Sequence, residues 1–175
     1  MKENWNISFD RVMKSEGGFK LTTLQGDAGG QTYAGIARVP NPQWEGWALI
    51  DQNKTPPDEM VMKFYKAAIW DKIKGDELPT GVDYLVFDFA VNAGPGQAAK
   101  LLQRAVGAVA DGAIGPATIA AVKAHDPAEL LDEYAKKKEE FYHEIVERRP
   151  ENARFIKGWL NRVAHVGEIA KTMVA

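Results

Sequence analysis

Apolar residues recur at helical spacing along most of the chain. Near the N-terminus, Phe9, Val12 and Met13 stand at positions i, i+3 and i+4 of one face of an amphipathic helix. Glu16 is the i+7 position of the same face, so the helix places a carboxylate where the core is expected. Gly17 and Gly18 follow, and glycine just beyond the last turn is typical of a helix end. The pattern therefore predicts a helix that stops next to a glutamate on its apolar face.

Further helices are predicted over the rest of the chain. The segment "GVDYLVFDFAVNAG" repeats the apolar spacing most strongly and predicts a helix of the core. The helix expected over residues 55–73 has Thr55 as its cap, and a later one opens at Pro116. The long helix that follows is expected to end at Pro150, and the last predicted helix carries an apolar face of Phe155, Trp159, Val163 and Val166.

A single stretch favours β-structure. In "LTTLQGDAGGQTYAGIA", two short β-prone arms flank a glycine-rich turn, which predicts a small hairpin. The following segment, residues 38–57, is rich in proline and tryptophan and is expected to be irregular and to form part of a cleft wall. The prediction is a mainly α fold with a small β-hairpin next to the first helix. The "GPG" at residues 94–96 predicts a boundary between residues 1–94 and 95–175, packed as one compact unit.

Composition narrows the function classes. The 175 residues are 45% hydrophobic and 26% charged, as in ordinary globular proteins, and the net charge of -2 gives no electrostatic case for nucleic acid. No cysteine is present, and the three histidines lack paired ligand spacing, so neither a metal nor another cofactor is expected. No run approaches the roughly 18 apolar residues of a membrane span. The N-terminus lacks the features of a secretory signal peptide, which predicts synthesis in the cytoplasm and a separate exit route.

Glu16 is the first candidate for chemistry. Its place near the negative end of a helix dipole, partly withdrawn from water, favours the protonated form that a general acid needs. A hairpin packed against the helix end would bring Asp27 and Thr32 to the same pocket. Two carboxylates flanking a scissile bond are the minimal equipment of a glycosidase, and a hydroxyl group can help to hold water. The alternatives are a glutamate that points outward, an aspartate that makes a turn and a threonine that fills a strand position.

Other polar and aromatic residues are candidates for substrate binding. Asp88 and Asn92 stand at i and i+4 of a helix whose other face is apolar, and they either bind groups of a glycan or cap and solvate the helix. Tyr33 and Trp70 are candidates for stacking on sugar rings, with core packing as the alternative for Trp70. The run "KKKEE" from Lys136 to Glu140 predicts a solvated helix face.

The order of the motifs resembles a known family. "SEGGF", "GDAGGQTYAGI", "IWDKI", "DFAVNAG", "LLQRAVG…DGAIGPAT" and "FIKGWLNRV" follow one another as in glycoside hydrolase family 108, the N-acetylmuramidases of bacteria and phages. The resemblance runs from Phe9 to Val163. It implies a lysozyme-like catalytic region over residues 1–94 with Glu16 as the acid, and a C-terminal helical region predicted to bind peptidoglycan. The order of Glu16, Asp27 and Thr32 also resembles phage-type lysozymes, which implies that Asp27 and Thr32 position water.

The resemblance sets the expected function. It implies hydrolysis of the β-1,4 bond between N-acetylmuramic acid and N-acetylglucosamine, with inversion or retention left open. The alternatives are a lytic transglycosylase, which needs only one glutamate, and a wall-binding or secretion-helper module without activity. The expected partner is the glycan strand of peptidoglycan, and the expected setting is a monomeric phage or prophage endolysin that a holin releases to the cell wall. The alternative setting is a bacterial enzyme that is exported by an unusual route.

Overall fold

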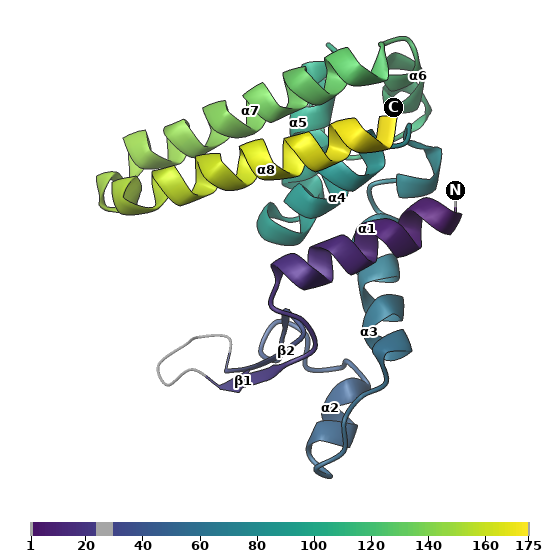
Figure 1. The fold of residues 1–175 in the computed structure, drawn as a ribbon, viewed down its shortest axis with the longest axis vertical. Coiled ribbons are helices and arrows are strands. Elements are labelled where there is room, and N and C mark those ends of the chain that lie inside the picture. Colours follow the sequence, from purple (N-terminus) through teal and green to yellow (C-terminus); the bar gives the residue numbers. More distant parts are fainter. Residues whose placement is uncertain (1, 24–29, 175) are drawn as a thin grey trace. The chain divides into compact units, whose positions relative to one another are not determined.

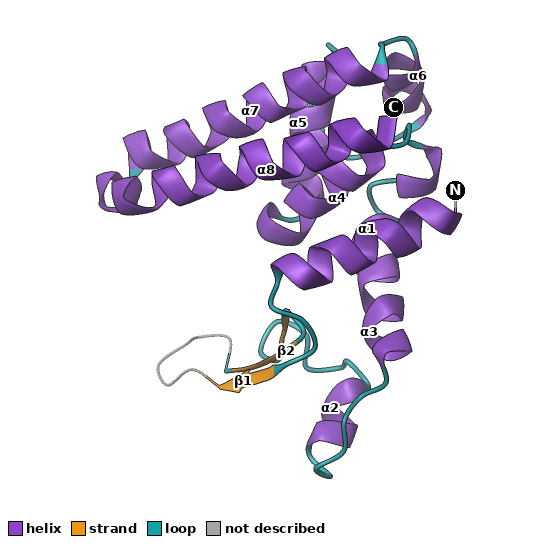
Figure 2. Ribbon diagram, in the orientation of Figure 1, coloured by secondary structure: helices purple, strands orange, loops and turns teal. Residues whose placement is uncertain are grey.

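The computed structural model describes residues 2–23 and 30–174, and most of them lie in helices (Figure 1). The predicted mainly α fold with a small β element is therefore confirmed (Figure 2). The chain forms two compact units. The small unit comprises residues 6–68, and the large unit comprises residues 69 onward together with the start of the chain up to Trp5. The boundary proposed from the sequence at residue 94 stays a prediction.

The small unit begins in helix α1 (Lys2–Ser15) and continues into a three-stranded antiparallel sheet of β1 (Leu21–Thr23), β2 (Gln31–Tyr33) and β3 (Ile36–Ala37). Strand β2 is central, with Thr32 opposite Thr22 on one side and Ala37 on the other. Two helices follow, α2 (Gly46–Ile50) and α3 (Asp58–Tyr65). The last residues before the large unit enter the π-helical turn η1 (Lys66–Trp70).

Three features of the small unit differ from the sequence prediction. The hairpin gains a third strand because the chain turns back at Ala34 and Gly35, which both have positive φ (48° and 81°), as a tight two-residue hairpin turn requires. The segment expected to be irregular contains α2. Asp51, the residue that follows this helix, accepts two hydrogen bonds of 2.8 Å from Arg38. Thr55 is not the cap of the next helix, because α3 begins only after Pro57, whose backbone is extended.

The large unit is a bundle of helices around α4 (Val82–Ala93), in which every residue from Val82 to Ala90 is buried. Around it lie α5 (Pro95–Ala105), α7 (Pro127–Arg148) and α8 (Ile156–Val174), and α7 and α8 run side by side (Figure 1). Shorter elements connect them, namely η2 (Gly75–Glu77), α6 (Pro116–Lys123) and η3 (Pro150–Phe155). Among residues 2–23 and 30–174, no helix is both long and apolar enough to cross a bilayer.

Buried polar contacts fix the connections within the large unit. Asn4 donates a hydrogen bond of 2.9 Å to Asp83, and the same carboxylate accepts from the backbone N–H groups that open α4. Gln103 is buried in α5 and donates to Asp111 and Thr118 while accepting from the N–H of Gly112. These bonds hold the turn of the motif "DGAIGPAT" against α5, so that the motif has a structural role.

The ends of the two longest helices of the large unit differ in how well the sequence predicts them. The long helix α7 does end before Pro150, since the residue that precedes a proline is disfavoured in helical conformation and Arg149 is non-helical. Phe155 is not on the buried face of the last helix, because it lies in η3 and is 43% exposed.

The sequence predicts a solvated face for the run from Lys136 to Glu140, and this is wrong for Lys138. Its side chain is 2% exposed, and its Nζ atom lies 3.8 Å from Oδ2 of Asp88. Burial lowers the pKa of Lys138 to about 8, although the charge of Asp88 acts in the opposite direction. Lys138 therefore occupies a core position that helical spacing from Leu131 and Tyr134 also fits.

The lowered pKa of Lys138 predicts that the free energy of unfolding depends on pH. In the unfolded chain the lysine keeps its proton up to about 10.5, whereas the folded protein releases it near pH 8. The unfolded state thus binds more protons in this window, so Lys138 makes the free energy of unfolding rise with pH, by at most about 1.4 kcal/mol per pH unit. Lys138→Met is expected to remove this rise in denaturant titrations between pH 8 and 10. Exposed Lys136→Met is the control, and equal slopes in the two variants would contradict the account.

Candidate active site

Glu16 directly follows Ser15, the last residue of α1. Its N–H completes a helical bond of 2.9 Å to Val12, and the next two residues close the helix through bonds from Gly18 to Met13 (2.9 Å) and from Gly17 to Lys14 (3.4 Å). This pair of bonds is a Schellman motif, in which Gly17 takes the left-handed conformation with a φ of 86°. The motif fixes the direction in which the Glu16 side chain leaves the helix. Glu16 itself is half-buried.

The turn between β2 and β3 lies beside the Glu16 carboxylate. A Cβ atom placed on Gly35 would be 4.0 Å from Oε2 of Glu16, so the bare backbone of Gly35 is close to the acid. Gly35 is also exposed. A ligand can therefore contact the exposed backbone of Gly35 close to the carboxylate.

Tyr65, the last residue of α3, holds the turn in place. Its buried hydroxyl group donates a hydrogen bond of 2.8 Å to the carbonyl oxygen of Ala34, and a Cβ atom on Gly35 would collide with the same hydroxyl. Burial raises the pKa of Tyr65 well above its ordinary value of 10, and the negative charge of Glu16 raises it further. The phenol therefore stays neutral and acts as a fixed donor close to Glu16.

Aromatic packing makes this arrangement rigid. The ring of Phe9 in α1 contacts Tyr65 edge-on at 5.9 Å between centroids, and it contacts Phe19, just after the helix end, at 6.3 Å. Phe64 covers another edge of Tyr65 at 5.6 Å. The apolar stripe of α1 thus positions the tyrosine as well as the glutamate.

The other residues that the sequence proposed for catalysis belong to the small unit as well. Thr32 is half-buried in the middle of β2. Tyr33 is its neighbour along the strand, so the two side chains point to opposite faces of the sheet. Asp27 lies outside the described residues. The roles proposed for Asp27 and Thr32 stay predictions.

Tyr33 is buried, 4% exposed, and one face of its ring stacks on Trp44 at 5.9 Å between centroids. Trp44 is the more exposed of the two and, with Phe64 and residues 40–43, lines a cavity of about 460 Å³. The sequence predicted that this segment forms part of a cleft wall, which stays a prediction, but it did not single out Trp44, because a tryptophan in an aperiodic segment carries no signal of its exposure.

Asp88, Asn92 and Trp70, the proposed substrate-binding residues of the large unit, differ in accessibility. Asp88 is 1% exposed, and Arg162 donates a hydrogen bond of 2.9 Å to its Oδ1 atom. Asn92 is exposed, and its Nδ2 atom donates to the backbone carbonyl of Asp88 at 3.1 Å. The glycan-binding roles of Asp88 and Asn92 stay predictions. Arg162, which the sequence analysis missed, connects the buried carboxylate to the surface.

Trp70 is fully buried between the rings of Trp5 and Phe87, and its Nε1 atom donates a hydrogen bond of 3.0 Å to Asp76. A sugar ring has no access to either face of the indole while this packing holds. The alternative of core packing, which the sequence left open, accounts for Trp70.

A double-mutant cycle tests the contact between Gly35 and Tyr65. Gly35→Ala is expected to destabilise the protein by more than the roughly 1 kcal/mol that a positive φ costs, since the new methyl group collides with the phenol. Tyr65→Phe removes the hydroxyl, so the double variant should be more stable than the sum of the two single effects predicts. Gly107→Ala, with a φ of 72° and open space around it, is the control. Additive effects in chemical denaturation would contradict the geometry.

Comparisons with known proteins identify the family of the chain. Residues 9–94 match the model of the family described as "Glycosyl hydrolase 108", and residues 97–164 match that of a "Predicted Peptidoglycan domain". The solved structure of SagA from Brucella abortus is similar with a TM-score of 0.81 and 30% identity, over 99% of this chain and 97% of that chain. No curated protein sequence gives a significant match. The chain therefore belongs to the glycosyl hydrolase 108 family, with the lysozyme-like, mainly helical fold predicted for it, and is a glycoside hydrolase that acts on the peptidoglycan of the cell wall.

Proposed function

We propose that this hydrolase is an N-acetylmuramidase, which cleaves the β-1,4 bond between N-acetylmuramic acid and N-acetylglucosamine. Glu16 is the general acid, and Asp27 with Thr32 positions the attacking water. The observation that carries the proposal is the half-buried Glu16 at the end of α1, beside the exposed backbone of Gly35. Its place within the segment that matches glycosyl hydrolase 108 supports the same assignment.

The reaction requires one proton donor and one activated water. Glu16 gives its proton to the glycosidic oxygen, and the bond between this oxygen and C1 of the muramic acid breaks as positive charge develops on the ring. The oxygen of water then bonds to C1, and its proton passes to Asp27. Attack from the opposite face of the sugar gives inversion, whereas direct attack by Asp27 would give retention.

The neighbours of Glu16 suit this role. The neutral phenol of Tyr65 brings no negative charge to the site, and its hydrogen bond to Ala34 keeps the turn at a fixed distance from the acid. The exposed backbone of Gly35 lies beside the acid, where a sugar can contact it. Such fixed positioning is what makes a single carboxylic acid an effective proton donor.

Glu16→Gln keeps the size of the side chain but cannot donate the proton. Activity is expected to fall by about a hundredfold or more, with an unchanged unfolding curve. The measurement is the release of reducing ends from purified peptidoglycan. Glu45→Gln changes an exposed glutamate of the same unit and is the control. Normal turnover in the folded Glu16→Gln protein would remove Glu16 from the mechanism.

Asp27→Asn tests the second carboxylate. An asparagine can still position water but cannot take its proton, so the rate of hydrolysis should fall heavily while a residual rate remains. A lytic transglycosylase has no use for this group, because a hydroxyl of the substrate attacks in place of water. Unchanged turnover in this variant would therefore favour the transglycosylase. The measurement is the rate at which the variant and the wild-type protein release soluble fragments from purified peptidoglycan.

A further inference from the structure

The large unit contains a cavity of about 530 Å³ at the end of α4, bordered by α5, α7 and α8. Its lining divides by chemistry. The aromatic rings of Phe141, Tyr142 and Trp159 form an apolar wall, and the polar groups are those of Asn92, Gln97 and Arg162.

The apolar wall is built from rings that support each other. Tyr142 of α7 stacks on Trp159 of α8 at 5.0 Å between centroids. Phe89, buried in α4, contacts Phe141 edge-on at 5.4 Å and Tyr142 at 6.1 Å. The wall therefore exists before a ligand arrives, which lowers the entropic cost of binding.

The polar side carries positive charge. Arg162 is about one third exposed, and its guanidinium is anchored by the hydrogen bond of 2.9 Å to Asp88. Lys138 contacts the other oxygen of the same buried carboxylate at 3.8 Å. The exposed part of the guanidinium lies at the cavity, where a carboxylate of a ligand can pair with it.

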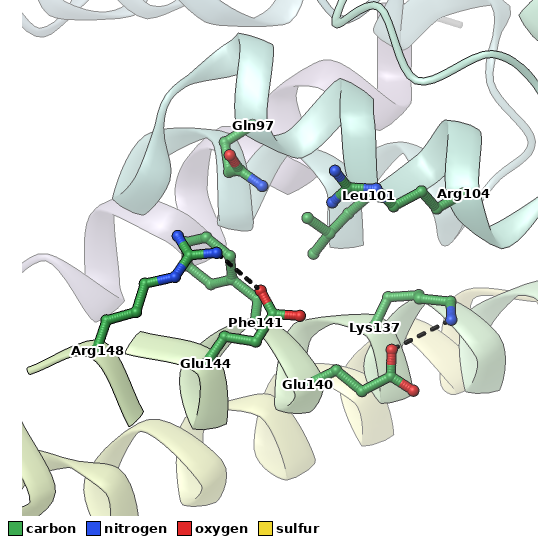
Figure 3. A pocket seen from close by; sticks show the side chains of 8 residues that line it. All are labelled: Gln97, Leu101, Arg104, Lys137, Glu140, Phe141, Glu144 and Arg148. Carbon is green, nitrogen blue, oxygen red and sulfur yellow. Dashed lines mark hydrogen bonds and ion pairs between the residues drawn. The ribbon is translucent and has the colours of Figure 1, made fainter. Parts of the chain in front are cut away.

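A neighbouring cavity of about 240 Å³ shares Gln97 and Phe141 but differs in character (Figure 3). Its lysine and one of its arginines pair with glutamates of their own helix, Lys137 with Glu140 at 3.1 Å and Arg148 with Glu144 at 3.9 Å, as the dashed lines in Figure 3 show. These pairs lie along one face of α7, and each glutamate already offsets the charge of its cation.

We propose that the cavity beside Arg162 binds the stem peptide of peptidoglycan. A peptide carboxylate pairs with Arg162, its amide groups bond to Asn92 and Gln97, and its small apolar side chains pack on the ring wall. The inference rests on the proposed function, since it takes peptidoglycan as the substrate. The match of residues 97–164 to a peptidoglycan domain supports it, because that range contains five of the six residues named above as lining the cavity.

The chemistry of the substrate favours the peptide over the sugar. The glycan strand bears no charge where peptides are attached, since the lactyl carboxylate of muramic acid is then bound in an amide. The carboxylates of an intact wall belong to the stem peptides. The protein has a net charge of -2, so attraction to the substrate must come from local groups such as Arg162.

Calorimetric titration with a disaccharide tetrapeptide tests the proposal, with every protein carrying Glu16→Gln so that the probe is not cleaved. Arg162→Gln is expected to weaken binding by about tenfold or more. Gln97→Glu places a negative charge in the cavity and should weaken binding as well. Gln97 lies in the first turn of α5, where a glutamate is favourable for the helix, so this variant is informative even if Arg162→Gln does not fold. Arg154→Gln, an exposed arginine outside the cavity, should bind normally.

Two controls identify the ligand. A neutral chitotetraose should be unaffected by either substitution. If the peptide-free disaccharide, which exposes the lactyl carboxylate, binds as tightly as the peptide-bearing probe and responds equally to the substitutions, the stem peptide is not the ligand. If Gln97→Glu binds the probe as tightly as the protein with Glu16→Gln alone, the proposed peptide site is wrong. If the wild-type protein cleaves peptidoglycan but neither substitution in the cavity weakens binding of the probe, this inference is refuted and the proposed function stands. If the substitutions weaken binding but the wild-type protein does not cleave peptidoglycan, the proposed function is refuted and this inference stands.

Discussion

The candidate active site depends on the backbone bonds that end α1. The bond from Gly18 to Met13 stops the helix at Glu16 and sets the direction of its side chain. The apolar stripe before it, through Phe9, places Tyr65, and Tyr65 in turn places the turn that contains Gly35. One helix end therefore determines the acid, the donor beside it and the exposed backbone of Gly35 next to the acid.

The large unit depends on a different constraint, which is that a charged side chain is buried in its core. Asp88 is withdrawn from water inside the bundle, and such a group is tolerated only when it is paired. Lys138 and Arg162 provide the pairing from α7 and α8. Because Arg162 extends from this cluster to a cavity, the same contacts that stabilise the core can present a cation to a ligand.

The sequence predicted those features that are encoded locally. The end of α1 at Glu16 follows from helical spacing and two glycines, and the end of α7 follows from Pro150. The contact of Tyr65 with Ala34 joins residues 31 positions apart, and that of Arg162 with Asp88 joins residues 74 positions apart, so neither leaves a periodic signal. Lys138 was assigned to a solvated face because all five residues from Lys136 to Glu140 are charged. Its helical spacing from the apolar residues of α7, which indicates a core position, was not taken into account. The start of α3 was misplaced because Thr55 is a good cap by type, yet two prolines separate it from the helix.

The most direct test of the account is digestion of purified peptidoglycan in water labelled with heavy oxygen, followed by mass spectrometry of the fragments. The account predicts that the label appears at the reducing end of N-acetylmuramic acid in the wild-type digest, since water attacks C1 of that sugar. Label at the reducing end of N-acetylglucosamine would mean that the other glycosidic bond is cleaved. Unlabelled anhydro ends would show that a substrate hydroxyl attacks in place of water, and either result would contradict the proposed muramidase.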